Sequence, residues 1–123
     1  MIDHIENLRR VRKLLLKSLE FEINYSEINE DLSQLKVLLK SGIIIYIKYN
    51  QFGEYGYQIL YSRKRADWSR FDNYDDRWDV ETRPHHLHER GNKVAQSSPM
   101  IGDPNKDVQK LVKYVRKKKI EEI

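Results

Sequence analysis

The chain has 123 residues, a length that predicts a single domain over residues 1–123. It contains no cysteine, which excludes a disulfide framework, a thiolate metal site and a thiol nucleophile. The net charge of +4 at pH 7 favours polyanionic partners, although a solvated surface rich in charged residues accounts for the same excess.

The sequence shows no sign of a membrane segment. No apolar run approaches the roughly 18 residues needed to span a bilayer. The first residues, with Asp3 and Glu6 among arginines, lack the pattern of a signal peptide. We therefore expect a cytoplasmic protein that makes no membrane contact.

The first predicted element is a helix over about residues 3–18. Asp3 and Glu6 have the spacing of a capping box, and apolar residues then recur at steps of three and four. The other face of this helix is basic, and it is either solvated or a binding surface for phosphate. Its cations are Arg9, Arg10, Arg12, Lys13 and Lys17.

Residues 26–40 fit two interpretations. Ile28, Leu32, Leu35 and Leu39 have helical spacing, whereas Leu35, Val37 and Leu39 alternate as in a strand. A turn at Ser41-Gly42 would lead into the β-rich run that follows, which favours strands.

An antiparallel β-meander is predicted over about residues 33–88. Apolar residues alternate over 43–50 and 55–61, a short strand returns near 68–71, and the links are too short for crossovers. Asp103-Pro104 then starts a second helix, over about residues 104–119, with its own apolar stripe. The expected fold is α+β: four or five antiparallel strands with a basic N-terminal helix and a C-terminal helix.

Three of the four histidines fall within four positions, at His85, His86 and His88. In an extended segment His86 and His88 share one face and His85 points to the other, and Pro84 favours extended backbone at Arg83. Neutral imidazoles can ligate Zn²⁺, and histidines can also act as general base and acid near neutral pH. A cluster with no function is the third alternative.

A second group of polar residues precedes the histidines. Asp72 and Asn73 fit the end of a strand, and they can also orient a histidine or an arginine such as Arg70. Trp78 can stack on a base or pack in the core. The usual phosphate loop, serine elbow and metalloprotease motifs are absent from the sequence.

Three segments resemble one known family. These are Tyr55-Gly56-Tyr57, residues 68–73 (WSRFDN) and residues 80–88 (VETRPHHLH). Together they are similar to the TumE-type toxins of prokaryotic toxin–antitoxin operons, with Arg83 and Leu87 standing where that family has phenylalanine and lysine. The resemblance implies a growth-inhibiting toxin, a cognate antitoxin that is commonly a helix-turn-helix protein, and activity toward RNA.

The favoured hypothesis is an endoribonuclease that needs no metal or other cofactor. His86 or His88 would deprotonate the ribose 2′-OH and the other would protonate the leaving oxygen, while Arg83 and Arg70 stabilise the phosphate and Asp72 orients a partner. His85 belongs to the same candidate catalytic set, and Asn73, Tyr57 and Trp78 are expected to support these groups or bind substrate. The alternatives are a non-catalytic module that binds nucleic acid or the antitoxin, and a metalloprotein with His85, His86 and His88 as ligands. A homodimer is compatible with each.

Overall fold

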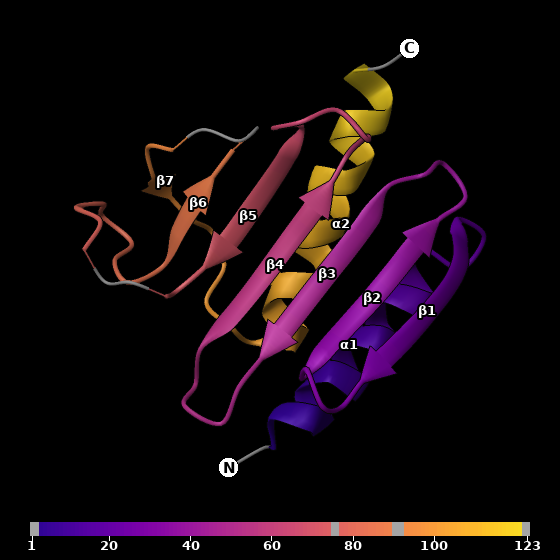
Figure 1. Cartoon of the computed structure of the whole chain (residues 1–123), viewed down its shortest axis with the longest axis horizontal. Coiled ribbons are helices and arrows are strands. Elements are labelled where there is room, and N and C mark those ends of the chain that lie inside the picture. Colours follow the sequence, from indigo (N-terminus) through magenta and orange to yellow (C-terminus); the bar gives the residue numbers. More distant parts are fainter. Residues whose placement is uncertain (1–2, 75–76, 90–92, 122–123) are drawn as a thin grey trace.

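The computed structural model describes residues 3–74, 77–89 and 93–121. Seven antiparallel strands form one sheet in chain order, so the sheet is a meander. The strands are β1 (Ile23–Asn29), β2 (Gln34–Leu39), β3 (Ile44–Tyr49), β4 (Tyr55–Leu60), β5 (Trp68–Asp72), β6 (His86–His88) and β7 (Gln96–Ser97). The helices α1 (His4–Ser18) and α2 (Pro104–Glu121) lie on the same face of the sheet (Figure 1).

The expectation of four or five strands is wrong, because the sheet has one more strand at each edge. The expected strands correspond to β2–β6. β1 was missed because its apolar residues are sparse and it is a largely exposed edge strand. β7 was missed because it is only two residues long and both are exposed.

Within residues 26–40, the end of β1 and the whole of β2 are strands joined by a turn over 30–33, which resolves the ambiguity in favour of strands. Leu35, Val37 and Leu39 are buried on the helix-covered face, while Leu38 points the other way and is half-buried. The turn after them is at Gly42, which has a φ of +98° that a glycine adopts without strain.

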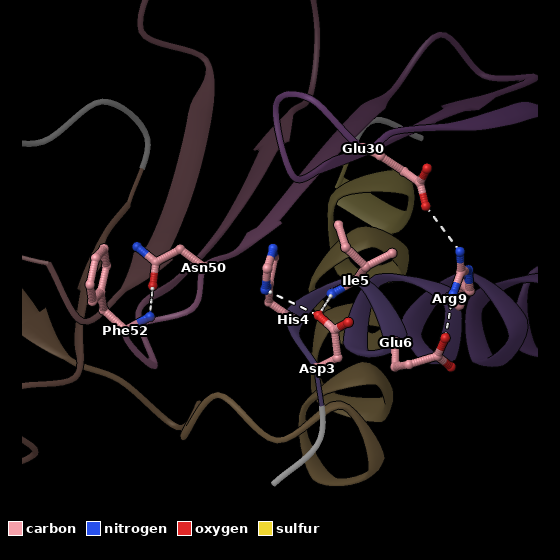
Figure 2. Close-up of polar contacts among 8 residues, drawn as sticks. All are labelled: Asp3, His4, Ile5, Glu6, Arg9, Glu30, Asn50 and Phe52. Atoms are coloured by element: carbon pink, nitrogen blue, oxygen red, sulfur yellow. Dashed lines mark hydrogen bonds and ion pairs between the residues drawn. The ribbon is translucent and has the colours of Figure 1, made fainter.

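The N-terminus of α1 is capped as the sequence predicts, in part. The carboxylate of Asp3 accepts a hydrogen bond from the backbone N–H of Ile5, at 3.0 Å (Figure 2). A complete capping box would also have Glu6 accept the backbone N–H of Asp3. Instead, the Glu6 carboxylate pairs with Arg9. Arg9 also reaches Glu30 in the β1–β2 turn, at 2.9 Å.

Three arginines of the basic face of α1 hold the fold together. Besides Arg9, Arg10 donates to Asn105 at the start of α2 at 2.8 Å, and Arg12 donates to Ser26 in β1 at 2.9 Å. These bonds use much of the face that could have served as a phosphate-binding surface.

The core lies between the sheet and the two helices. α1 contributes Leu8, Val11, Leu15 and, just after its end, Leu19; the stripe of α2 consists of Val108, Leu111, Val112 and Val115, and all eight are buried. Phe71 of β5 packs edge-on against Tyr114 of α2, with ring centroids 4.8 Å apart. Because both helices cover one face, the opposite face of β1–β6 is left without a covering helix (Figure 1).

Candidate functional site

The uncovered face of the sheet is organised in three rows that cross the strands, because each strand sends every second side chain to this face. The strand register defines the rows. The apolar row consists of Tyr25, Leu38, Ile44, Leu60 and Trp68. The cationic row, next to it, consists of Lys36, Tyr46, Gln58, Arg70 and His88 on β2–β6, and Glu27 of β1 lies in register with Lys36 at its end. The Asp72 row consists of Gln34, Lys48, Gly56, Asp72 and His86.

Asp72 connects three groups at the end of β5. Its carboxylate lies 2.8 Å from Nε of Arg70 and 2.9 Å from Nε2 of His86. It also accepts the backbone N–H of Tyr74 at 3.0 Å. Asp72 is 4 % exposed, so these contacts replace water around a buried carboxylate and fix the direction of the Arg70 side chain.

His86 is held on both sides. While Nε2 faces Asp72, Nδ1 lies 3.1 Å from the carbonyl oxygen of Pro84. Both neighbours are hydrogen-bond acceptors, so each ring nitrogen of His86 faces a protein oxygen. His86 is 3 % exposed, and neither nitrogen offers a lone pair to a substrate. These two contacts hold the His86 ring in place beside Asp72.

His88 lies in a different environment, although it is only two residues away. It is half-buried at the end of the cationic row, directly across from Arg70 in the strand register. Trp78 packs edge-on against the His88 ring at 5.1 Å and also contacts His86 at 6.0 Å. Arg77 stacks over Trp78 at 4.6 Å, which brings a further cation to this corner of the sheet.

His85 points to the opposite side, as expected for an extended segment. Its Nδ1 lies 2.9 Å from the hydroxyl of Tyr55, and the two rings are stacked at 5.8 Å. The three histidines therefore do not converge on one point. Across the described residues, no group of three or more histidine, aspartate or glutamate side chains could hold a metal ion.

Two of the remaining predicted site residues, Tyr57 and Asn73, make contacts within the fold. Tyr57 is 1 % exposed on the helix-covered face, where its hydroxyl donates to Asp107 of α2 at 2.7 Å. Asn73 accepts the backbone N–H of Tyr55 at 2.9 Å and donates to the carbonyl of Gly53, so it ties β5 to the β3–β4 turn. Arg83 is exposed in the loop before β6.

A cavity of about 270 Å³ opens on the uncovered face beside Arg70. It lies where Gly56 provides no side chain, and the ring of Tyr74 covers that glycine at 3.5 Å from the position of a Cβ. Its lining residues are Gln34, Tyr46, Lys48, Gly56, Gln58, Arg70 and Tyr74. Among these, only Arg70 belongs to the site predicted from the sequence. The alternation of residues along each strand indicates which side chains share a face, but it does not give the register that places residues of different strands side by side.

The charge around the cavity favours an anion. Arg70 and Lys48 both line the cavity, and the Asp72 carboxylate that pairs with Arg70 also lies 2.9 Å from Nε2 of His86. Farther along the cationic row, Lys36 lies 6.0 Å from the rings of both Tyr25 and Tyr46, and its hydrogen bond to Tyr25 raises the pKa of Lys36. Burial raises the pKa of Tyr74, and the nearby Arg70 partly opposes that rise.

In the described parts of the chain, the fold is a seven-stranded meander with two helices on one face. Arg70 and Lys48 line a cavity on the other face. The family model described as toxin TumE matches residues 8–119. The chain therefore belongs to the TumE toxin family, which places it among the toxin components of toxin–antitoxin systems and implies an antitoxin as its partner. No curated protein and no solved structure matches the chain. Over the described residues, neither helix has the length and apolarity required to cross a bilayer.

Proposed function

We propose that this toxin is an endoribonuclease that binds RNA on the uncovered face of its sheet and cleaves it without a metal ion. The observation that carries the proposal is the placement of Arg70 and His88. They are register neighbours on that face, and Asp72 fixes the guanidinium at 2.8 Å. A fixed guanidinium beside an imidazole is a suitable pair for a phosphate and the hydroxyl that attacks it.

In the proposed reaction, His88 takes the proton of the ribose 2′-OH. The 2′-oxygen attacks the adjacent phosphorus, the bond from phosphorus to the 5′-oxygen breaks, and the departing 5′-oxygen takes up a proton from water. The protonated His88 then gives its proton to the resulting hydroxide, which restores the neutral imidazole and the water. The products are a 2′,3′-cyclic phosphate and a 5′-hydroxyl. Arg70 and Lys48, which both line the cavity, stabilise the added negative charge on the phosphate in the transition state.

The other residues of the cluster have supporting roles in this proposal. Asp72 and His86 hold Arg70 in place, and Trp78 packs on His88 and restricts its ring. This assignment changes the expectation that His86 and His88 share the acid and base roles, since both ring nitrogens of His86 already face protein acceptors. His85 contacts Tyr55 and Tyr57 contacts Asp107 of α2, both away from the uncovered face, so they are outside the proposed site.

Purified protein and a labelled RNA test the proposal. We expect cleavage that persists in EDTA, and 2′,3′-cyclic phosphate ends on the product. His88→Ala and Arg70→Ala should each lower the rate by at least about a hundredfold, the scale of general-base and transition-state charge effects. His4→Gln, a histidine on α1, is the matched control and should cleave as the unaltered chain does.

A substrate with a single ribonucleotide in a DNA strand makes the test sharper. It should be cut only after that ribonucleotide, because the deoxyribose positions have no 2′-OH. Cleavage that continues undiminished in His88→Ala would exclude the mechanism. Salt-sensitive RNA retention without any cleavage would favour a non-catalytic binding module instead.

The proposal extends to the partner and its setting. We propose a cytoplasmic toxin whose antitoxin is a helix-turn-helix protein, either monomeric or homodimeric on its own. A small neighbouring reading frame of that type, whose product restores growth when expressed together with this chain, would support the pairing. Growth inhibition that the product leaves unrelieved would count against it.

A further inference from the structure

We infer that the RNA is bound as a single strand that crosses the β-strands, with its bases over the apolar row and its phosphates along the cationic row. This inference rests on the proposed function, because it names the form and direction of the substrate at the same site. It assigns a role to the apolar row, which the proposed reaction does not use.

The apolar row is unusual for an uncovered sheet face. Its five members come from five successive strands and lie side by side in the register. Tyr25 is 43 % exposed, and the other four are half-buried. An antiparallel sheet with one wet face normally places polar residues there, so a continuous apolar row indicates a surface that is covered during function.

The ends of the apolar row are aromatic. Tyr25 marks the β1 end and Trp68 the β5 end, and both rings can stack on bases. Stacking on an aromatic ring contributes about 1–3 kcal/mol per base and requires no particular sequence. It does require the flat face of the base, which a duplex buries in its own stack. The row therefore suits a single strand.

The neighbouring row supplies the charge. The cationic row lies two residues from the apolar row on each of β2–β5, about 7 Å away, whereas the corresponding residue of β1 is Glu27. It carries Lys36 on β2 and Arg70 on β5, and it ends at His88 on β6. Bases on one row and phosphates on the other match the two sides of an extended RNA strand.

The direction follows from the same register. From Lys36 to His88 there are four inter-strand steps of about 4.8 Å, or about 19 Å in total. That span accommodates a site of about four nucleotides or more, at the lower end of known single-strand sites. A strand laid along it brings a phosphate to Arg70, which is where the proposed cleavage occurs.

The test uses the whole chain and 2′-O-methyl RNA, which has no free 2′-OH to attack and so reports binding alone. An unstructured single strand of about twelve nucleotides should bind at least about tenfold more tightly than a duplex of the same sequence. Tyr25→Ala should weaken single-strand binding about fivefold or more, and Tyr25→Phe should retain it, because stacking needs the ring and not the hydroxyl. Phe21→Ala is the matched control, since Phe21 is 82 % exposed outside the sheet.

Two further measurements locate the phosphates and the bases. Lys36→Gln should lower the slope of log affinity against log salt by about 0.7, the value for one phosphate contact on a single strand. In Trp78→Phe, where Trp68 is the remaining tryptophan, single-stranded RNA should quench the fluorescence.

The outcomes separate this inference from the proposed function. Duplex binding as tight as single-strand binding would overturn the inference even if RNA is cleaved. Unchanged affinity in Tyr25→Ala would also overturn it, and would leave a protein partner as the occupant of the apolar row. Tight, Tyr25-dependent single-strand binding without cleavage of ordinary RNA would support the inference and contradict the catalytic proposal.

Discussion

The Nε2 atom of His86 lies 2.9 Å from Oδ1 of Asp72, and both side chains are at most 5 % exposed. His88, two residues along the same strand, is half-buried, lies across from Arg70 in the strand register and packs against Trp78. Two histidines on one face of β6 therefore have different environments: one faces the buried carboxylate, and the other lies beside Arg70 on the uncovered face.

This difference predicts that His86→Ala mainly lowers the stability of the protein, whereas His88→Ala mainly lowers its RNA cleavage activity. His86→Ala removes a partner from a buried carboxylate, which should lower the free energy of unfolding by about 3 kcal/mol. His88→Ala changes a half-buried position and should cost less than about 1 kcal/mol, while RNA cleavage is lost. Urea unfolding and a cleavage assay on the same preparations provide the comparison, and equal losses of stability in the two variants would contradict it.

A second prediction concerns Gly56, the floor of the cavity. A Cβ there would meet Tyr74 at 3.5 Å and Arg70 at 3.9 Å, which are ordinary contacts, so Gly56→Ala should fold with a change of stability within about 1 kcal/mol. Gly56→Leu should fill the cavity and displace Tyr74, and RNA binding should fall about tenfold.

Fluorescence anisotropy with 2′-O-methyl RNA measures that loss, and circular dichroism checks that the sheet is intact. Ile101→Leu, at an exposed position near the start of α2, serves as a control of similar size. Full affinity in a folded Gly56→Leu protein would show that the cavity takes no part in binding RNA.

The sequence predicts the centre of this fold better than its edges. β2, β3 and β4 alternate clearly because one face of each is buried against the helices. β1 and β7 are edge strands with exposed residues, so the hydrophobic pattern that marks a strand is weak or absent there. The helices carry continuous apolar stripes, and both are present as predicted.

The site was predictable only where its residues are close together in the chain. The histidine cluster and Asp72 are near one another in sequence, but Lys48 and Gln58 join them through the register of β3, β4 and β5. Tyr57 shows the limit of motif spacing: its neighbour Gly56 faces the cavity, so alternation sends Tyr57 to the helix-covered side.

A third prediction follows from Gly102, which precedes α2. Its φ is +88°, and a Cβ there would lie 2.8 Å from the ring of Tyr55. Gly102→Ala should therefore destabilise the protein by about 2–3 kcal/mol, from backbone strain and the clash together. Gly53→Ala is the control, since Gly53 has a φ of +78° but nothing within 4 Å of its Cβ position, and it should cost about 1 kcal/mol.

Thermal and urea unfolding of both glycine variants measure the difference. A larger loss in Gly102→Ala would assign the excess to the contact with Tyr55. Equal losses would mean that the loop before α2 moves away from the ring at little cost.

The last prediction concerns the buried tyrosines beneath α2. The hydroxyl of Tyr49 lies 2.7 Å from that of Tyr57, and Tyr57 donates to Asp107, which also accepts the backbone N–H groups of Ile101 and Gly102. Burial raises the pKa of both tyrosines well above the ordinary value of 10.0. Below pH 10 the phenols are protonated in both the folded and the unfolded chain, so the stabilisation is fully present.

Above pH 10 only the unfolded chain releases these protons, so stability should fall as pH rises, by up to about 1.4 kcal/mol per pH unit for each tyrosine. Tyr57→Phe should make that fall shallower, and at pH 7 it should cost about 1–3 kcal/mol because a bond to the buried Asp107 is lost. Tyr49→Phe should make the fall shallower by a similar amount and cost less at pH 7, because it keeps the hydrogen bonds to Asp107. Urea unfolding between pH 7 and pH 11 tests both variants, and an alkaline slope that neither substitution reduces would place the titrating groups elsewhere.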